Sequence, residues 1–585
     1  MGSLTPPGHH GAPIGEGAFA PVYDALGATF CADRFTHQQV WECSQVAGVR
    51  VWESHRSEVW MFVPYNAAEV VSVMLAVLPR LLTWQPGASF DPVARALPRD
   101  ARLRPYQLEV VHQFALPQCG ERLLLADAMG LGKTASAIAC MKLRGGPKLI
   151  IGPKSLRSTW RAELQKWAPG ERFDFIETIQ PAVVFQEALP DISALRWVYI
   201  HYDLVHAWWS WLRLVPFTGV VLDEAHTVKN VTTLRGRAVM QAVGAIPARV
   251  ILTGTPIENR VAEFHHLLEL LTGKGTWGSK GAFRIRYAGA KPNIHGGLVD
   301  GAPTHTDELQ QRIQHHYMRR TVSMVRQQGL ELPPVERIPV PVPLDDKAVA
   351  KLQKVLTPAA LHALNLWRQT GTLPSAEDHQ AIKAIGALRA AVSKHKVEAT
   401  VQTVRRHLEA GDQVVVFTWT RDMAAHLATH FSAVSDGAGA TVITGEQSLG
   451  ARDKAVFTFR ERCEAGRRGV LIATYGALGV GVNLQCANVV LLHDLDWTPG
   501  VMLQAEARVW RGGQRRNVLS YWMVADATFD EYIIRTLLSK ADEIVAAIGD
   551  EEPQQLREAF SVYARPEAGV EDFVQQLALW AKNRI

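Results

Sequence analysis

The sequence predicts an α/β protein built on two tandem, doubly wound parallel sheets, and three observations support this prediction. The chain has 585 residues, more than one hydrophobic core usually supports, so two or three domains are expected. Between about residues 101 and 325, short apolar runs that end in polar turns alternate with helical patterns. The same alternation returns between about residues 401 and 545. Parallel strands joined by helical crossovers form a doubly wound sheet.

A leader and a small domain precede the first of these regions. Residues 1–20 are rich in Gly and Pro and predict a flexible leader. Residues 28–95 predict a small α/β accessory domain. Its apolar runs at 49–52 and 59–64 are typical of a β-hairpin, and a helix over residues 66–82 is expected to cover them.

The first lobe is expected over residues 101–325 and has apolar runs typical of buried strands. These runs lie at residues 123–125, 148–151, 197–200, 219–222 and 249–252. A helical insertion, interrupted by a loop rich in Gly, Pro and His, is expected at residues 264–320.

Prolines at 333 and 334 and between 339 and 343 mark the exit from the first lobe. Residues 326–400 are expected to form a mainly helical linker or brace. The second lobe, residues 401–545, is expected to begin with a helix and a strand at 413–417. Residues 550–585 predict a helical tail that packs on the lobes.

A glycine-rich turn after the first apolar run predicts a phosphate-binding loop. Backbone N–H groups of such a turn point inward, and the N-terminus of the following helix adds partial positive charge. Lys133 is expected to reach the β- and γ-phosphate oxygens, and the Thr134 hydroxyl to bind Mg²⁺. The alternative is a strand-to-helix turn in which the glycines only allow close packing. The predicted nucleotide-binding stretch comprises Asp127, Met129, Gly130, Leu131, Gly132, Lys133 and Thr134, with Asp127 in the place of the usual first glycine.

Two carboxylates follow the apolar run at 219–222, where a parallel sheet presents its carboxyl edge. Asp223 is expected to hold Mg²⁺, and Glu224 to orient and deprotonate the attacking water. A solvated acidic loop is the alternative. Thr253 and Thr255 follow the next run, where they either sense the γ-phosphate or cap a turn.

Far along the chain, Arg508 and Arg511 are three residues apart and would share one face of a helix. Two guanidinium groups suit the charge that develops on a phosphoryl group during transfer. The alternative is an exposed basic helix.

Taken together, these motifs resemble the SNF2 family of superfamily-2 (DEAH-box) DNA translocases and helicases, with the closest similarity to the annealing-helicase (HARP-type) branch. The resemblance covers roughly residues 101–540. The motifs run in family order: LRPYQ at 103–107, the phosphate loop, GPKSL at 152–156, DEAH at 223–226, LTGTPIEN at 252–259, VVFTW at 415–419, ATYGALGVGVNL at 473–484 and the arginine segment. The branch similarity rests on FRIRY at 283–287 and on Met318, Arg319 and Arg320.

The resemblance implies two RecA-like lobes that use ATP and Mg²⁺ to move along double-stranded or branched DNA. It places Gln107 at the adenine edge and Gly481 in the nucleotide site. It assigns Thr253, Thr255 and Gln504 to the coupling of ATP hydrolysis to movement along DNA. The DNA contacts that it implies are Lys154, Ser155, Thr418, Trp419 and Thr474. Two positions depart from the family pattern, since Ala128 replaces an acidic residue and Trp510 replaces a histidine.

Composition agrees with this interpretation. The net charge of +5 is small for such a chain, so DNA binding is inferred from the motifs and not from charge. Six cysteines lack zinc-site spacing, and no apolar run is long enough for a membrane span. A monomeric cytoplasmic protein of bacterial or phage origin is expected. A strand-separating helicase and an ATP-gated DNA-binding module without translocation remain the alternatives.

Overall fold

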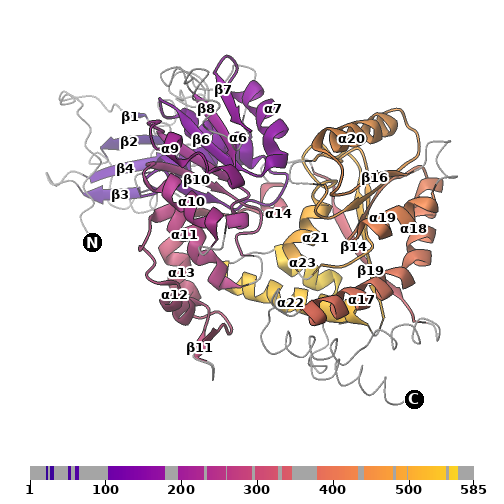
Figure 1. The fold of residues 1–585 in the computed structure, drawn as a ribbon. Helices are drawn as coiled ribbons and strands as arrows, with labels where there is room; N and C mark the ends of the chain where they lie inside the picture. The colour runs from indigo at the N-terminus through magenta and orange to yellow at the C-terminus, as the bar shows by residue number, and fades with distance from the viewer. Residues whose placement is uncertain are drawn as a thin grey trace, which may run out of the picture.

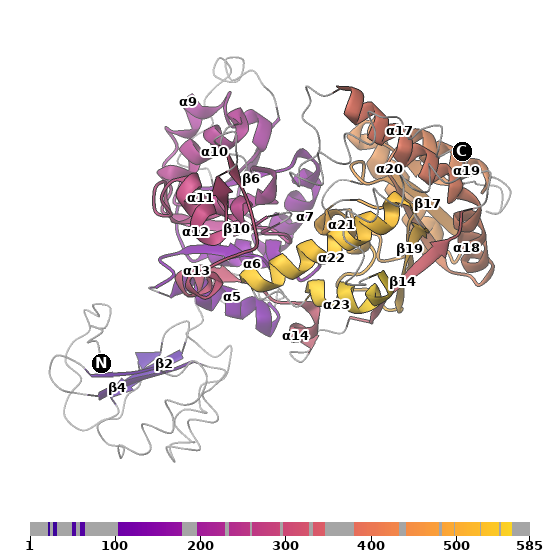
Figure 2. The same ribbon diagram turned by 90° about the horizontal axis from the view of Figure 1, so that it is seen from below.

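The computed structural model describes residues 22–23, 27–31, 50–53, 59–64, 103–116, 118–177, 196–228, 233–257, 260–292, 297–326, 332–344, 379–431, 440–478, 482–496, 498–526, 528–548 and 552–563. Two α/β lobes lie beside one another, and helix α22 runs between them (Figures 1 and 2). The predicted fold class is therefore confirmed. Within the described residues, the helices are all too short or too polar to cross a lipid bilayer.

The N-terminal strands form an antiparallel sheet in the order β1-β2-β4-β3. β3 (Arg50–Glu53) and β4 (Val59–Pro64) pair as the predicted hairpin, with Trp52 opposite Trp60. Two strands that were not predicted, β1 (Val22–Tyr23) and β2 (Gly27–Cys31), extend the sheet beyond β4. The helix expected over residues 66–82 lies outside the described residues.

In the described part of the first lobe, seven parallel strands form one sheet in the order β13-β5-β10-β9-β6-β8-β7. Its central strands are buried on both faces, which explains why they are apolar runs in the sequence. The strands are β5 (Arg122–Leu125), β6 (Lys148–Gly152), β7 (Phe173–Ile176), β8 (Trp197–His201), β9 (Gly219–Asp223), β10 (Ala248–Leu252) and β13 (Tyr317–Met318).

The register of three neighbouring strands decides where the site lies. Leu252 at the end of β10 pairs with Leu125 at the end of β5 and with Asp223 at the end of β9. The loops that follow these strands therefore leave the sheet at one edge, side by side.

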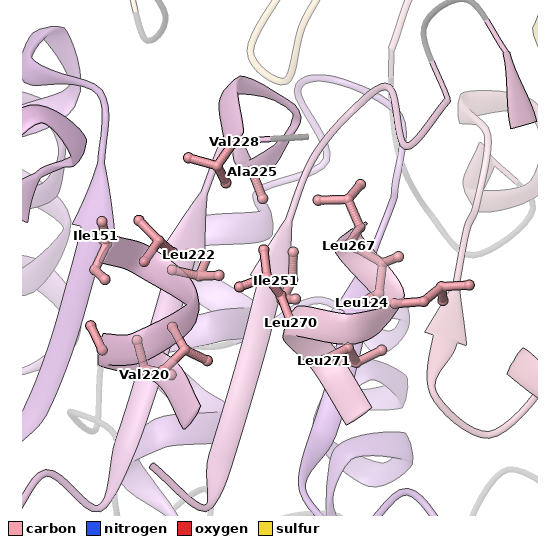
Figure 3. Close-up of a cluster of buried hydrophobic side chains, with 14 of the residues drawn as sticks. Leu124, Ile151, Val220, Leu222, Ala225, Val228, Ile251, Leu267, Leu270 and Leu271 are labelled. Atoms are coloured by element: carbon pink, nitrogen blue, oxygen red, sulfur yellow. The ribbon is translucent and has the colours of Figure 1, made fainter. Parts of the chain in front are cut away.

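Helices cover both faces of this sheet. On one face, Leu267 and Leu270 of α11 share an apolar cluster with Leu124 of β5 and Ile251 of β10 (Figure 3). The helices of the lobe are α5 (Pro105–Ala115), α6 (Lys133–Lys142), α7 (Arg157–Trp167), α9 (Trp209–Leu212), α10 (Leu234–Gly244) and α11 (Phe264–Thr272).

The region expected as a helical insertion contains α11, α12 (Lys280–Tyr287) and α13 (Thr306–Ile313). Between α12 and α13, the loop rich in Gly and Pro carries the short antiparallel pair β11 (Lys291–Pro292) and β12 (Leu298–Val299). The region ends in β13, which returns to the main sheet beside β5. α14 (Val322–Arg326) follows.

In the described part of the second lobe, six parallel strands form a sheet in the order β14-β19-β18-β15-β17-β16. The strands are β14 (Val335–Val342), β15 (Gln413–Thr418), β16 (Thr441–Ile443), β17 (Gly469–Thr474), β18 (Val489–Leu492) and β19 (Val518–Ala525). The helices are α17 (His379–His395), α18 (Val397–Glu409), α19 (Arg421–Thr429), α20 (Leu449–Glu464), α21 (Pro499–Glu506), α22 (Phe529–Ile548) and α23 (Glu552–Ala559).

Strand β14 differs from the expected linker over residues 326–400. It pairs with β19 along its whole length and forms one edge of the second sheet. Pro339 and Pro341 fit an edge strand because alternate N–H groups of such a strand point away from its single neighbour. The prolines thus mark an edge of the second sheet, and the lobe begins earlier in the chain than expected.

Helix α22 joins the two lobes. Ile533 and Ile534 near its start belong to the core of the second lobe, whereas Ala547 and Ile548 at its end belong to the core of the first. There the Gln310 side chain of α13 donates a hydrogen bond to the Ala547 carbonyl (3.4 Å). The following α23 packs on the second lobe, where the ring of Phe560 lies 4.7 Å from that of Trp522.

Candidate nucleotide-binding site between the lobes

The glycine-rich turn between β5 and α6 has the backbone that a phosphate cradle needs. Gly130 and Gly132 adopt φ angles of 83° and 79°, which side-chain-bearing residues rarely adopt. A Cβ atom on Gly132 would lie 2.4 Å from Gln107 Nε2, and one on Gly130 would lie 2.8 Å from Arg511 Cβ. Both positions therefore favour glycine, because the backbone is left-handed there and neighbouring atoms leave no room for a side chain.

Gln107 holds this turn from the side of α5. Its Nε2 donates to the Leu131 carbonyl (3.1 Å), and its Oε1 accepts from the Arg104 backbone N–H (3.0 Å) at the start of the helix. The side chain is buried beside the loop. In this structure both ends of the amide that was predicted to face adenine bind the protein itself.

Asp127 stands where the general pattern has a glycine, and its carboxylate binds Arg320. Asp127 Oδ1 accepts from Arg320 Nε (3.0 Å) and from the Arg320 backbone N–H (3.1 Å), and the second oxygen contacts Nη2. The Asp127 side chain is 2% exposed. The prediction that Asp127 contacts the nucleotide is therefore not supported for its side chain, which instead fixes the start of the loop to the end of β13.

Lys133 begins α6 and points back into the loop. Its Nζ donates to the carbonyls of Asp127 (2.8 Å) and Ala128 (3.3 Å), which is where phosphate oxygens would compete for it. Burial lowers the pKa of Lys133, while the nearby carboxylates of Glu224, Asp127 and Asp223 raise it. The lysine thus faces the acidic side of the site from inside the cradle.

The two carboxylates at the end of β9 have different surroundings. Asp223 accepts hydrogen bonds from Trp160 Nε1 (2.8 Å) and from the Glu224 backbone N–H (2.9 Å). Burial, reinforced by the charge of Glu224, raises the pKa of Asp223 to about 7. Glu224 has φ of 50°, and its Oε2 makes no hydrogen bond within the described residues but lies 3.3 Å from His226 Nδ1. An acceptor held in a strained backbone is typical of a functional position.

Thr253 and Thr255 connect these acids to the second lobe. Thr253 Oγ1 lies 3.4 Å from His226 Nδ1 and accepts from the Thr255 backbone N–H (3.1 Å). Thr255 in turn abuts Gly500, because a Cβ atom on that glycine would lie 2.7 Å from Thr255 Cγ2. Gly500 is in the first turn of α21, which also carries Gln504. A continuous set of contacts therefore leads from β9 to α21.

Arg508 and Arg511 face the phosphate loop from the second lobe. The backbone of Arg511 lies against Gly130, and the charges of Arg508 and Glu224 interact. Burial lowers the pKa of Arg508 to about 10, with Arg511 contributing, whereas Glu224 raises it. We call this meeting of the two lobes the seam.

The prediction that the two arginines share a helix face is wrong. α21 ends at Glu506, and residues 507–511, which we call the arginine turn, form successive turns held by the bonds of the Val509 and Trp510 N–H groups to the Glu506 carbonyl (both 3.0 Å). Trp510, which replaces the family histidine, packs in the core, and its Nε1 donates to the Pro333 carbonyl (2.7 Å).

The residues expected to contact DNA have different exposures. Lys154 is exposed in the short 3₁₀ turn after β6, with Ser155 half-buried beside it, and Trp419 is 40% exposed. Thr418 is fully buried and donates to Asp494 Oδ2 (2.6 Å), and Thr474 is also buried. Of these predicted DNA contacts, Trp419 therefore has an exposed side chain, whereas the side chains of Thr418 and Thr474 are buried.

The remaining predicted site residues lie around the loop. Thr134 follows Lys133 in the first turn of α6, and Met129 packs on Gly254. Leu131 is buried and accepts the bond from Gln107. Gly481 lies outside the described residues.

Arg319 lies at the site, although its sequence pattern did not predict a position there. Its Nη1 donates to the carbonyls of Ala126 (2.6 Å) and Gly254 (3.0 Å), which joins the end of β5 to the loop after β10. Its charge also reaches Lys133. The adjacent arginines were visible in the sequence, but only the sheet order shows that β13 brings them to the phosphate loop.

Comparison with known families agrees with this geometry. Residues 106–397 match the SNF2-related domain, and residues 395–513 match the helicase conserved C-terminal domain. The chain belongs to the SNF2 family. The predicted resemblance is thus confirmed, and the two matched domains meet at the seam, since the first contains the phosphate loop and the second the arginine turn.

Relatives of this SNF2 chain include annealing helicases. The SWI/SNF-related matrix-associated actin-dependent regulator of chromatin subfamily A-like protein 1 of Xenopus tropicalis is 29% identical over 74% of this chain and 43% of its own length. The human DNA annealing helicase and endonuclease ZRANB3 is 27% identical over 75% of this chain and 40% of its own length. The chain therefore spans less than half of these curated relatives. Among solved structures, the Sulfolobus solfataricus SWI2/SNF2 ATPase core in complex with dsDNA is 25% identical, with a TM-score of 0.36, over 78% of this chain and 97% of that one.

Proposed function

We propose that this protein is a DNA-dependent ATPase that moves along or remodels double-stranded or branched DNA. The observation that carries the proposal is the seam. Lys133, Asp223 and Glu224 of one lobe lie at the glycine-rich loop, where the charge of Arg508 from the other lobe interacts with Glu224 and Arg511 lies against Gly130. Such a site assembles cationic and acidic groups around a triphosphate only when the lobes are together.

Each residue has a chemical task in this proposal. Lys133 leaves the carbonyls that it binds and pairs with the β- and γ-phosphates of ATP. Glu224 accepts a proton from the attacking water, for which its Oε2 has a free acceptor position within the described residues. Arg508 and Arg511 stabilise the negative charge that develops on the transferred phosphoryl group.

The residues present also fit Mg²⁺. No group of three or more His, Cys, Asp or Glu side chains in the described ranges could hold a metal by itself. Mg²⁺ suits such a site because it retains water and binds one or two protein groups plus the phosphates. Asp223 and Thr134 would hold the Mg²⁺ ion, which would neutralise part of the phosphate charge.

The lobes supply the mechanical part of the proposal. A γ-phosphate held by both sides favours the closed seam, and hydrolysis removes that bridge. Thr253, Thr255 and Gln504 lie on the contact path from β9 to α21, so they are suited to transmit the change. Both halves of the site come from one chain, which is consistent with a working monomer.

DNA is the proposed partner because of the family and its relatives. The names of two relatives describe a DNA annealing helicase and a SWI2/SNF2 core bound to dsDNA. Lys154, Ser155 and Trp419 are the predicted contacts that reach the surface. Contacts to the DNA backbone predict binding that tolerates sequence changes and weakens as salt rises.

Steady-state ATP hydrolysis by the purified protein, with and without duplex, forked and single-stranded DNA, tests this proposal. Duplex or forked DNA is expected to stimulate turnover more than RNA does. Lys133→Ala and Glu224→Gln should each reduce turnover by at least about 100-fold, since each removes a group used in the transition state. Glu224→Gln should still bind ATP, and Lys454→Ala, an exposed lysine of α20, serves as the control. Normal turnover in either site variant would contradict the assignment.

Two further assays separate the alternatives. Displacement of a triplex-forming strand without unwinding of a duplex supports translocation, whereas duplex unwinding supports a strand-separating helicase. DNA binding that depends on ATP, with no phosphate release, would identify an ATP-gated binding module.

A further inference from the structure

A buried ion pair lies directly behind the arginine turn. Arg337 of β14 and Glu506 of α21 are 169 residues apart in sequence and form a two-pronged contact, with Nε 3.1 Å from both carboxylate oxygens and Nη2 2.5 Å from Oε1. The side chains are only 4% and 1% exposed. The mechanism proposed above uses neither residue.

Glu506 is placed to set the geometry of the turn. It is the last residue of α21, and its own carbonyl accepts the hydrogen bonds from Val509 and Trp510 that close the turn around Arg508. On the other side of the turn, the Leu484 N–H donates to the Arg508 carbonyl (2.8 Å). Fixing the Glu506 side chain therefore fixes the residue from which the turn is built.

The same segment of chain holds the other end of the turn. Pro333, four residues before Arg337, accepts the hydrogen bond from Trp510 Nε1. Residues 333–337 thus bind the arginine turn at two points, through a carboxylate before it and an indole within it. This segment follows the first lobe in sequence and enters β14 of the second lobe, although it lies within the SNF2-related match of residues 106–397.

Stability alone is a weak explanation for such a pair. Removing two charges from water costs several kcal/mol, and apolar replacements of buried ion pairs are often as stable or more stable. A bidentate guanidinium–carboxylate contact does provide fixed geometry. The arginines of the turn need that geometry, since a displacement of about 1 Å can reduce turnover about 100-fold.

We propose that Arg337 and Glu506 are positioning residues that hold the arginine turn in register with the phosphate loop. This inference rests on the proposed ATPase function. It assigns to the edge strand β14 a role in catalysis through Arg508 and Arg511, without contact with ATP.

The test compares two double variants that each remove one buried ion pair of the second lobe. Arg337→Met/Glu506→Gln removes the pair behind the turn without leaving an unpaired charge. Lys396→Met/Asp530→Asn removes a pair that is equally buried, with side chains 1% and 6% exposed and Nζ 2.8 Å from Oδ2. This control pair links the residue that precedes α18 to the start of α22 and is separate from the contacts of the arginine turn. The measurements are thermal unfolding, kcat and KM for ATP with saturating duplex DNA, and DNA affinity.

The inference predicts that Arg337→Met/Glu506→Gln lowers kcat by about 10- to 100-fold with little change in DNA affinity. The control should retain kcat within about twofold at a temperature where both proteins are folded. Wild-type kcat in a folded Arg337→Met/Glu506→Gln protein would overturn the inference, as would an equal loss in both variants. If the wild-type protein itself shows no DNA-stimulated hydrolysis, the proposed function fails instead.

Discussion

At the scale of single residues, adjacent side chains of the site differ in chemistry because their surroundings differ. Asp223 is held by the Trp160 indole and the Glu224 backbone N–H, and burial raises its pKa to about 7. Glu224 turns away on a backbone with positive φ and faces Arg508 and His226. The two neighbouring carboxylates therefore have different partners, and the proposed function gives them different tasks.

The first residue-scale prediction concerns pH. Protonated Asp223 is neutral and cannot hold Mg²⁺, so Mg²⁺-dependent ATP binding should weaken as pH falls through about 7. Glu224→Gln removes a negative charge that raises the pKa of Asp223, so its binding midpoint should move to lower pH. Titration calorimetry of ATP with Mg²⁺ between about pH 5.5 and 8.5 measures both midpoints. Identical midpoints in the two proteins would show that Asp223 does not control this binding.

The second residue-scale prediction uses two glycines with the same backbone. Gly132 and Gly170 both have φ of 79°, but only Gly132 has a neighbour, Gln107 Nε2, where a Cβ atom would lie. Alanine at either position should cost about 1 kcal/mol of unfolding free energy from backbone strain. Gly132→Ala should also displace Gln107 and weaken ATP binding about tenfold, or by about 1.4 kcal/mol. Denaturant unfolding measures the backbone strain in both variants, and ATP affinity measures the additional effect of displacing Gln107. Equal ATP affinities in the two variants would show that displacing Gln107 does not weaken ATP binding.

At the scale of elements, two segments do not keep to the lobe boundaries that were predicted from the sequence. β14 completes the second sheet although it lies before the α17–α18 helices, and α22 leaves the second lobe to end in the core of the first.

The element-scale prediction concerns the end of α22. Ala547 is fully buried against the first lobe, so Ala547→Glu should cost about 3 to 5 kcal/mol by burying an unpaired charge. We expect the wild-type protein to unfold in one calorimetric transition. In Ala547→Glu the end of α22 should separate from α13, and this transition should split into two. Ser539→Glu, at an exposed position of the same helix, is expected to change little. A single, unshifted transition in Ala547→Glu would mean that this contact does not join the lobes.

The strands show which elements a sequence can predict. β6, β8, β9 and β10 are buried on both faces, so each is an uninterrupted apolar run between polar turns. β14 escaped prediction because its prolines are compatible with a strand only at a sheet edge, and the edge is a property of the complete sheet. The two-residue strand β13 is too short to produce a periodic signal.

At the scale of the whole molecule, the site exists only where the lobes meet. The loop glycines, Lys133 and the acids could be predicted because each follows a strand, and parallel strands end at one edge. Two partners of this loop could not be predicted, because Arg319 and Arg320 reach it through the position of β13 in the sheet and not through sequence spacing. Similarly, the pairing of Arg508 and Arg511 was predicted, but from a helix that ends two residues before the first of them.

The prolines of β14 have a consequence for how the molecule behaves among its copies. An open strand border normally offers a row of N–H donors to which a foreign strand can attach, and this is a common route to aggregation. Pro339 and Pro341 remove two of those donors from the outward side of the second sheet. The outermost strand is thereby a poor template for further growth, which protects the protein from edge-to-edge polymerisation while leaving its inward pairing with β19 intact.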